Sequence, residues 1–133
     1  MHSINKFRAK ILLISIVSTF ITIRFILYFF PNADFNLFGF NIHHLYTGII
    51  LIILSGIPLI IISTKHRIFD FITAVFGIGL SLVLDEWIYL IATDGTNESY
   101  FTTVSYIGGM AFLLFTCIYI SILYFFLSHK DKD

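Results

Sequence analysis

The sequence predicts an all-α, polytopic membrane protein in which four transmembrane helices form an up-down bundle. Hydrophobic residues make up 58% of the 133-residue chain and charged residues 12%, whereas soluble domains average about 45–50% and about 25%. The apolar residues gather in four stretches, each long enough to supply the roughly 20 residues that cross a bilayer. Because short polar links join these stretches, consecutive helices must be antiparallel neighbours.

The predicted spans differ in their polar content. Within a single domain of residues 1–133, they cover residues 10–30, 42–63, 69–92 and 100–127. Arg24 interrupts the first span, the adjacent Asp85 and Glu86 interrupt the third, and the fourth contains no charged residue. Links rich in polar and turn-forming residues separate the spans at 31–34, 64–67 and 93–99.

Basic residues lie almost entirely at one end of the predicted bundle. Seven of the eight Lys and Arg residues flank the spans there: Lys6, Arg8, Lys10, Lys65, Arg67, Lys130 and Lys132. The links at the other end carry Asp34, Asp94 and Glu98 instead. Because cytoplasmic loops are enriched in Lys and Arg, we expect both termini inside a multi-pass protein of the cell membrane, with a prokaryotic inner membrane as its location. The first span lacks a small-residue cleavage pattern, which favours an uncleaved anchor over a signal peptide.

Composition and motifs exclude several classes of function. The formal net charge is zero and the chain has one cysteine, Cys117. Neither a nucleic-acid binder that relies on basic charge nor an intrachain disulfide framework fits these values. The sequence also lacks a Gly-x-Ser-x-Gly elbow, a P-loop, a Cys-x-x-Cys and a His-Glu-x-x-His motif. The lipid bilayer is the expected partner, while a homo-oligomer, a partner membrane protein and the substrate stay open.

Polar groups on all four spans fall at one depth. At about 1.5 Å per residue, one residue of each span lies roughly 5–10 Å inside its outer end: Arg24, His44, Asp85 and Ser105. Two further candidates to line this layer are Tyr106 and Thr47. Ionisable side chains within a span usually face a partner or a wet cavity, so we expect a polar pocket in the outer leaflet.

The residue types in this layer suit a divalent metal ion. Two histidines open the second span and two carboxylates lie in the third: His43, His44, Asp85 and Glu86. Imidazole nitrogen and carboxylate oxygen are ligands of zinc and of non-haem iron or manganese. In a membrane-embedded hydrolase the metal would activate water, a spare carboxylate would act as general base and Arg24 would steady an anion.

Two other interpretations stay open. Arg24 can pair with Asp85 or Glu86 while the histidines bond the other carboxylate, which makes the layer a structural network in a non-catalytic assembly partner. Alternatively, Asp85 or Glu86 titrates in an ion- or proton-coupled carrier or channel subunit. The sequence leaves open whether the chain is an enzyme.

Two motifs in the second and third spans resemble those of a family of small prokaryotic integral membrane proteins. The first is His43-His44-Leu45-Tyr46-Thr47-Gly48, of the form His-His-x-x-x-Gly. The second runs from Gly77 to Glu86 and has the form Gly-x-Gly-x5-Asp-Glu. The resemblance implies no particular activity. It implies that the two histidines and the two carboxylates act as a matched set.

Overall fold

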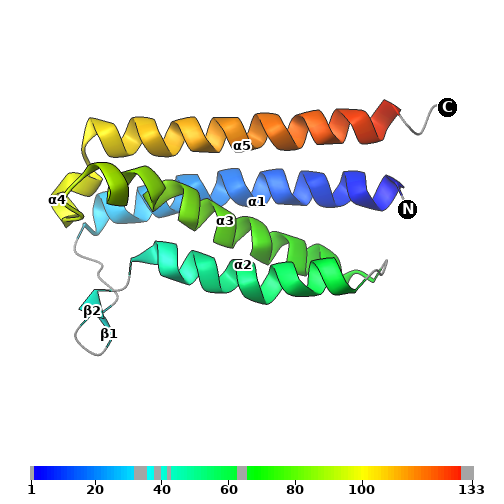
Figure 1. Cartoon of the computed structure of the whole chain (residues 1–133), viewed down its shortest axis with the longest axis horizontal. Coiled ribbons are helices and arrows are strands. Elements are labelled where there is room, and N and C mark those ends of the chain that lie inside the picture. The colour runs from blue at the N-terminus through cyan, green and yellow to red at the C-terminus, as the bar shows by residue number, and fades with distance from the viewer. Residues whose placement is uncertain (1, 32–35, 38–39, 42, 63–65, 130–133) are drawn as a thin grey trace.

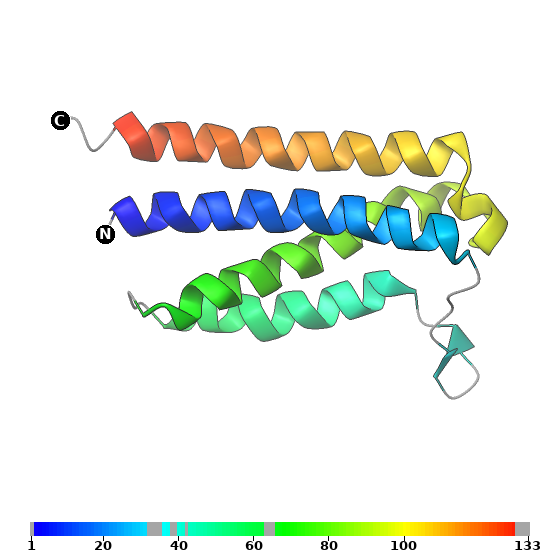
Figure 2. The same ribbon diagram turned by 180° about the vertical axis from the view of Figure 1, so that it is seen from behind.

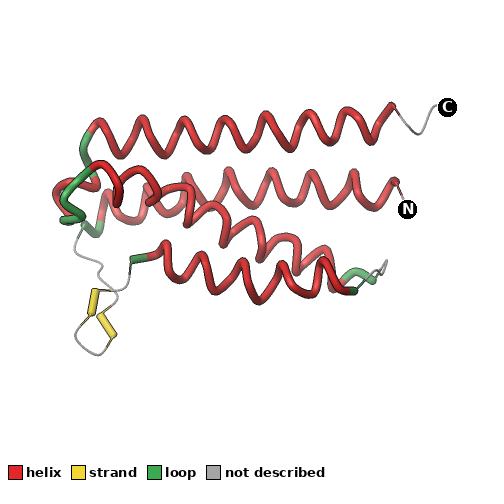
Figure 3. Tube along the Cα trace, viewed as in Figure 1, coloured by secondary structure: helices red, strands yellow, loops and turns green. Residues whose placement is uncertain are grey.

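The computed structural model describes residues 2–31, 36–37, 40–41, 43–62 and 66–129. Long helices dominate it: α1 (His2–Phe29), α2 (His44–Ile61), α3 (Ile68–Ala92) and α5 (Thr103–His129) (Figures 1 and 3). A single-turn helix, α4 (Asn97–Tyr100), lies between α3 and α5. Strands β1 (Asn36–Leu37) and β2 (Phe40–Asn41) pair antiparallel between α1 and α2.

Within the described residues, four helical segments are long and apolar enough to cross a membrane, as the sequence predicts: Lys6–Phe29, His44–Ile61, Ile68–Ala92 and Thr103–Phe126. The main difference lies at the fourth span, which begins at Thr103 and not at residue 100. The Thr96 hydroxyl caps the separate helix α4 by accepting the Ser99 N–H at 3.3 Å. Parts of the predicted links and tail lie outside the described residues, namely 32–35, 64–65 and 130–133, with the basic residues Lys65, Lys130 and Lys132.

Helix α3 is the centre of the molecule. It packs against α1, α2 and α5, whereas α2 packs mainly against α3. Figures 1 and 2 show α3 crossing obliquely between α2 and the pair formed by α1 and α5. In the most apolar segment of α3, 39% of the residues are buried. In the corresponding segments of the other three spans, only 11–17% are buried. Among the described residues, α1 and α2 are therefore connected mainly through α3, which corrects the expectation that these two consecutive helices are neighbours.

Glycines set the close approach of α2 to α3. A Cβ atom on Gly48 would lie 2.6 Å from the carbonyl oxygen of Gly79, and one on Gly79 would lie 2.8 Å from the carbonyl oxygen of Gly48. Real Cβ atoms do not approach a backbone oxygen so closely, so both positions require glycine. Small residues of this kind let membrane helices come into backbone contact.

The two ends of the molecule differ in chemistry. The start of α1 and the end of α5 lie at one end, called the terminal end below, and α4 and the β1–β2 hairpin lie at the other (Figures 1 and 2). Towards the terminal end, α1 and α5 enclose an apolar core of Ile16, Phe20, Leu113 and Ile120. Arg8 and Asp70 form a partly exposed ion pair at 3.1 Å near the same end. The remaining buried charges gather at the α4 end.

Candidate functional site

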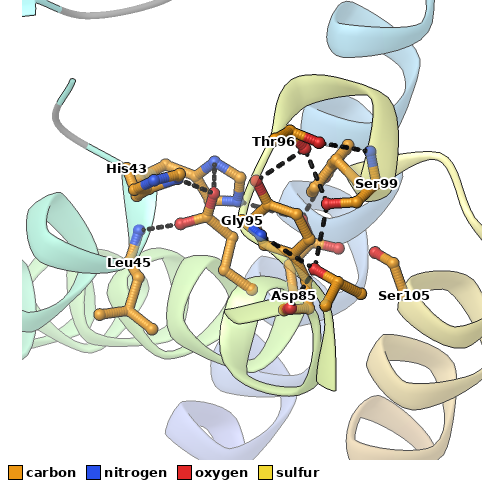
Figure 4. A network of polar contacts seen from close by, with 12 residues as sticks. His43, Leu45, Asp85, Gly95, Thr96, Ser99 and Ser105 are labelled. Atoms are coloured by element: carbon orange, nitrogen blue, oxygen red, sulfur yellow. Dashed lines mark hydrogen bonds and ion pairs between the residues drawn. The ribbon is translucent and has the colours of Figure 1, made fainter. Parts of the chain in front are cut away.

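Five helices bring polar side chains together at the α4 end. We define the polar cluster by its members: Arg24, His43, His44, Asp85, Glu86, Tyr100 and Ser105. Figure 4 shows His43 and Leu45 of α2 on one side of Asp85 and Ser105 of α5 on the other, with Thr96 and Ser99 above. As the helical rise predicts, Arg24, His44, Asp85 and Ser105 therefore lie together in the structure.

Asp85 is the most enclosed member, with no exposed surface. Its Oδ1 accepts a hydrogen bond from Arg24 Nε, and its Oδ2 accepts one from the Tyr100 hydroxyl. Oδ2 also lies 3.0 Å from His44 Nε2. The Arg24 and Tyr100 donors, one to each oxygen, suit an ionised carboxylate, which only accepts hydrogen bonds.

Arg24 is buried, and its guanidinium group is held on every side. Nη2 donates to Ser105 Oγ at 3.2 Å and to the carbonyl oxygens of Ser105 and Asp85 at 3.3 Å. Nη1 donates to the Tyr100 carbonyl oxygen at 3.4 Å. The rings of Tyr100 and Tyr106 lie 4.3 and 4.7 Å from its central carbon, in the range of cation–π contacts. The charge is thus fully partnered inside the protein.

Glu86 joins the start of α2 to α3. It is 3% exposed, and its Oε2 accepts the backbone N–H of Leu45 at 2.7 Å. Its Oε1 lies 3.3 Å from Nδ1 of His43 and 3.2 Å from Nδ1 of His44. His43 occupies the N-cap position of α2 but makes no capping hydrogen bond with its side chain. Glu86 therefore satisfies a free N–H of the first turn from a neighbouring helix.

His44 lies between the two carboxylates. Its Nε2 faces Asp85 Oδ2 at 3.0 Å and its Nδ1 faces Glu86 Oε1 at 3.2 Å. A neutral imidazole has one N–H donor, whereas the protonated ring has two. The contact with Asp85 is a hydrogen bond, whereas the contact with Glu86 is an ion-pair distance that becomes attractive when the ring carries a second proton.

The cluster is graded from its interior to its edge. The side chains of His43 and His44 are 21% and 17% exposed, whereas those of Glu86 and Asp85 are almost completely buried. The histidines therefore connect the buried carboxylates to the surface at the α4 end.

Tyr100 is the member that sequence reasoning missed, because the predicted fourth span begins at this residue. It is 4% exposed and lies on α4, outside the membrane-spanning helices. Burial, together with the nearby Asp85 charge, raises the pKa of the Tyr100 phenol far above its ordinary value, so the group stays a hydroxyl donor. Only the break between α4 and α5 reveals its position.

The loop before α4 fixes how that helix sits over the cluster. The buried Tyr89 donates its hydroxyl to the Thr96 carbonyl oxygen at 3.0 Å. Asp94 accepts from the Thr96 hydroxyl at 2.9 Å. Hydrogen bonds from Ser99 and Thr96 hold the pKa of the exposed Asp94 carboxyl below its ordinary value. These contacts attach Tyr100 to α3 through a short, bonded loop.

The remaining candidate residues fall partly in the cluster. The Tyr106 ring packs on Arg24, but Thr47 is exposed on α2 and takes no part in these contacts. Among the residues that the structure describes, no three His, Cys, Asp or Glu side chains are arranged to hold a metal ion. Of the predicted ligands, His43 shares a hydrogen bond with Glu86, and His44 shares one with Asp85. Metal binding stays a prediction of the sequence.

Comparison with known proteins adds no relative: no family model matches the chain, and neither a curated protein nor a solved structure matches it. The resemblance to a prokaryotic family therefore stays a prediction. Four apolar helices make the chain a small multi-pass membrane protein, and the polar cluster is its candidate site.

Proposed function

We propose that the polar cluster is a proton-binding site of a small multi-pass membrane protein, open to the outer side of the cell membrane. One observation carries the proposal: His44 lies between two carboxylates, with Nε2 hydrogen-bonded to Asp85 Oδ2 at 3.0 Å and Nδ1 3.2 Å from Glu86 Oε1. With both carboxyl groups ionised and the ring protonated on Nε2 alone, the lone pair of Nδ1 would lie beside the negative Oε1 of Glu86. An additional proton, shared by His44, Asp85 and Glu86, completes the network.

Charge balance supports the same conclusion. Asp85 and Glu86 are both buried, and Arg24 supplies a single positive charge beside them. An uncompensated charge inside a low-dielectric environment is costly. One added proton makes the cluster neutral overall. Because the groups interact strongly, the proton belongs to the cluster and not to one residue.

The proposed side follows from the charge distribution along the chain. The cluster lies at the end opposite the termini (Figure 1), and the basic residues flank the spans at the terminal end. With both termini in the cytoplasm, His43 and His44 face the outside. The cluster would then exchange protons with the medium outside the cell.

A binding site fits the surroundings of the cluster better than a path through the membrane. In the described part of the chain, buried hydroxyl groups beyond the cluster donate to nearby carbonyl oxygens: Ser81 to Ile16 at 2.8 Å and Thr73 to Phe69 at 2.6 Å. Apolar residues of α1 and α5 fill the space towards the terminal end. A proton-coupled carrier would need a path of proton-exchanging groups from the cluster towards the terminal end, and these residues do not provide one.

Nitrogen NMR of protein with isotope-labelled histidine rings, in lipid nanodiscs, tests the proposal, and His44→Gln assigns the signal. Near neutral pH we expect two protonated nitrogens on His44, or one neutral ring together with a protonated carboxyl group seen by infrared spectroscopy. A neutral ring between two ionised carboxylates near neutral pH would contradict the proposal.

Metal analysis of the same samples distinguishes proton binding from the metal binding that the sequence predicts. We expect protein purified without chelator to bind no stoichiometric zinc, iron or manganese when these ions are added. Stoichiometric binding that His44→Gln abolishes, and that weakens below about pH 6.5 as imidazole protonates, would favour the metal site and contradict proton binding as the function.

A further inference from the structure

We propose that the terminal half of α5 binds an anionic phospholipid, with one acyl chain in an apolar groove and the phosphate group on Lys10 of α1. The α5 groove is lined by one face of this helix, from Leu114 to Phe126 and including Cys117 and Ser121, and has a volume of about 460 Å³. It lies in the half of α5 away from α4 (Figure 1), so the proposal is independent of proton binding by the polar cluster.

The length of the α5 groove matches one leaflet of a bilayer. Its lining runs from residue 114 to residue 126, which at about 1.5 Å per residue is roughly 18 Å. One leaflet contributes half of a hydrocarbon core of about 30 Å, or roughly 15 Å. The groove also occupies the half of the span Thr103–Phe126 that lies nearer the terminal end. A lipid chain from one leaflet fits this length, whereas a helix of a second copy would cross both leaflets.

The lining of the α5 groove asks for no polar partner. Its one hydroxyl group, that of Ser121, donates to the Cys117 carbonyl oxygen at 2.7 Å. The side chains of Leu114, Ile118 and Phe125 are more than half exposed, and every lining residue belongs to α5. The groove is therefore open to the lipid, and a hydrocarbon chain is the occupant that matches its surface.

Lys10 supplies a positive charge beside the terminal end of the groove. Its Nζ lies 5.9 Å from the centre of the Tyr124 ring, next in sequence to Phe125 of the groove. Lys10 is exposed, and among the described residues no carboxylate pairs with it, whereas Arg8 pairs with Asp70 at 3.1 Å. A lysine near the end of a span extends its ammonium group towards the headgroups. With the termini in the cytoplasm, this charge faces the leaflet that is rich in anionic lipid.

Native mass spectrometry of the full chain in detergent, titrated with phosphatidylglycerol or phosphatidylcholine of equal acyl chains, tests the charge. We expect one phosphatidylglycerol per chain, bound about fivefold more tightly than phosphatidylcholine, the contribution of one lysine. Lys10→Gln should abolish this preference and Lys10→Arg should keep it. Arg67→Gln is the matched control, because Arg67 is an exposed cation at the N-cap of α3, and α1 lies between α5 and the start of α3 (Figures 1 and 2). Equal losses in Lys10→Gln and Arg67→Gln would overturn the proposal.

Ser121→Phe tests the groove, because it places a ring in the middle of the space for the acyl chain. This variant should bind both lipids several-fold more weakly and keep their ratio. Leu123→Phe is its control: Leu123 is also exposed on α5 but does not line the groove, so the affinities should stay those of the parent. Equal affinities of the two variants would overturn the proposal. A dimer of the parent that Ser121→Phe dissociates would do so too, because a second copy would then occupy the groove.

Discussion

Arg24 shows how a single buried charge is accommodated inside a small helical membrane protein. Its guanidinium group bonds a carboxylate on α3, carbonyl oxygens of three elements and the Ser105 hydroxyl. A side chain with so many partners cannot be removed alone without leaving Asp85 uncompensated. Gly109 leaves the space for it, because a Cβ atom at that position would lie 3.2 Å from Arg24 Nη2.

Arg24→Leu should therefore destabilise the protein more than the double variant Arg24→Leu/Asp85→Leu does. Removal of one partner of a buried pair typically costs about 3–5 kcal/mol, whereas an apolar replacement of the whole pair is often tolerated. Unfolding in detergent measures the difference, with Arg8→Ala/Asp70→Ala as control, since that partly exposed pair should contribute no more than about 1 kcal/mol. Additive losses for Arg24 and Asp85 would show that the two side chains are not coupled.

At the scale of the elements, α2 depends on α3 for nearly all of its packing. The Gly48–Gly79 contact fixes where the two helices cross, and Glu86 satisfies the first turn of α2. Lower along α2, Gly56 faces only the ring of Phe76, with a hypothetical Cβ 3.2 Å from the nearest ring atom. The two glycines of α2 therefore differ in what surrounds them: backbone in one case, a movable side chain in the other.

Gly48→Ala should consequently destabilise the protein by about 1–3 kcal/mol, the usual cost of overpacking, because a Cβ there meets the carbonyl oxygen of Gly79 at 2.6 Å. Gly56→Ala is the matched control, since the Phe76 ring can turn aside and alanine favours a helix. Thermal unfolding in detergent compares the two variants. Equal stability of both would contradict the close backbone contact between α2 and α3.

Sequence reasoning works where a fixed repeat determines position. The helical rise sets the depth of Arg24, His44, Asp85 and Ser105, and the structure does bring these residues into contact. The repeat does not choose between adjacent residues such as Asp85 and Glu86, which point about 100° apart on the helix. That choice depends on the central position of α3, with α1 on one side and α2 on the other. Tyr100 is hidden for a related reason: its role arises from a helix break that apolar composition does not mark.

At the scale of the whole molecule, the two ends differ in the sign of their charged residues. The terminal end carries the Arg8–Asp70 pair and the exposed Arg67 and His66, whereas the α4 end carries Asp94 and Glu98. The interior of the described part also differs between the ends: the buried charged side chains lie towards α4, and the apolar core lies towards the other end. The direction in which the chain inserts therefore decides which compartment the polar cluster faces.

Cysteine labelling determines that direction. In a Cys117→Ala background, Glu98→Cys and Asn36→Cys should react with an impermeant thiol reagent added to intact cells, whereas Thr64→Cys should react only after the membrane is opened. The excess of Lys and Arg beside the Thr64 link and near both termini motivates this expectation, and Glu98 is exposed on α4, so its replacement by cysteine should leave the cluster intact. The opposite labelling pattern would place His43 and His44 on the cytoplasmic side. The polar cluster would then exchange protons with the cytoplasm, and its response to external pH should disappear while its response to internal pH remains.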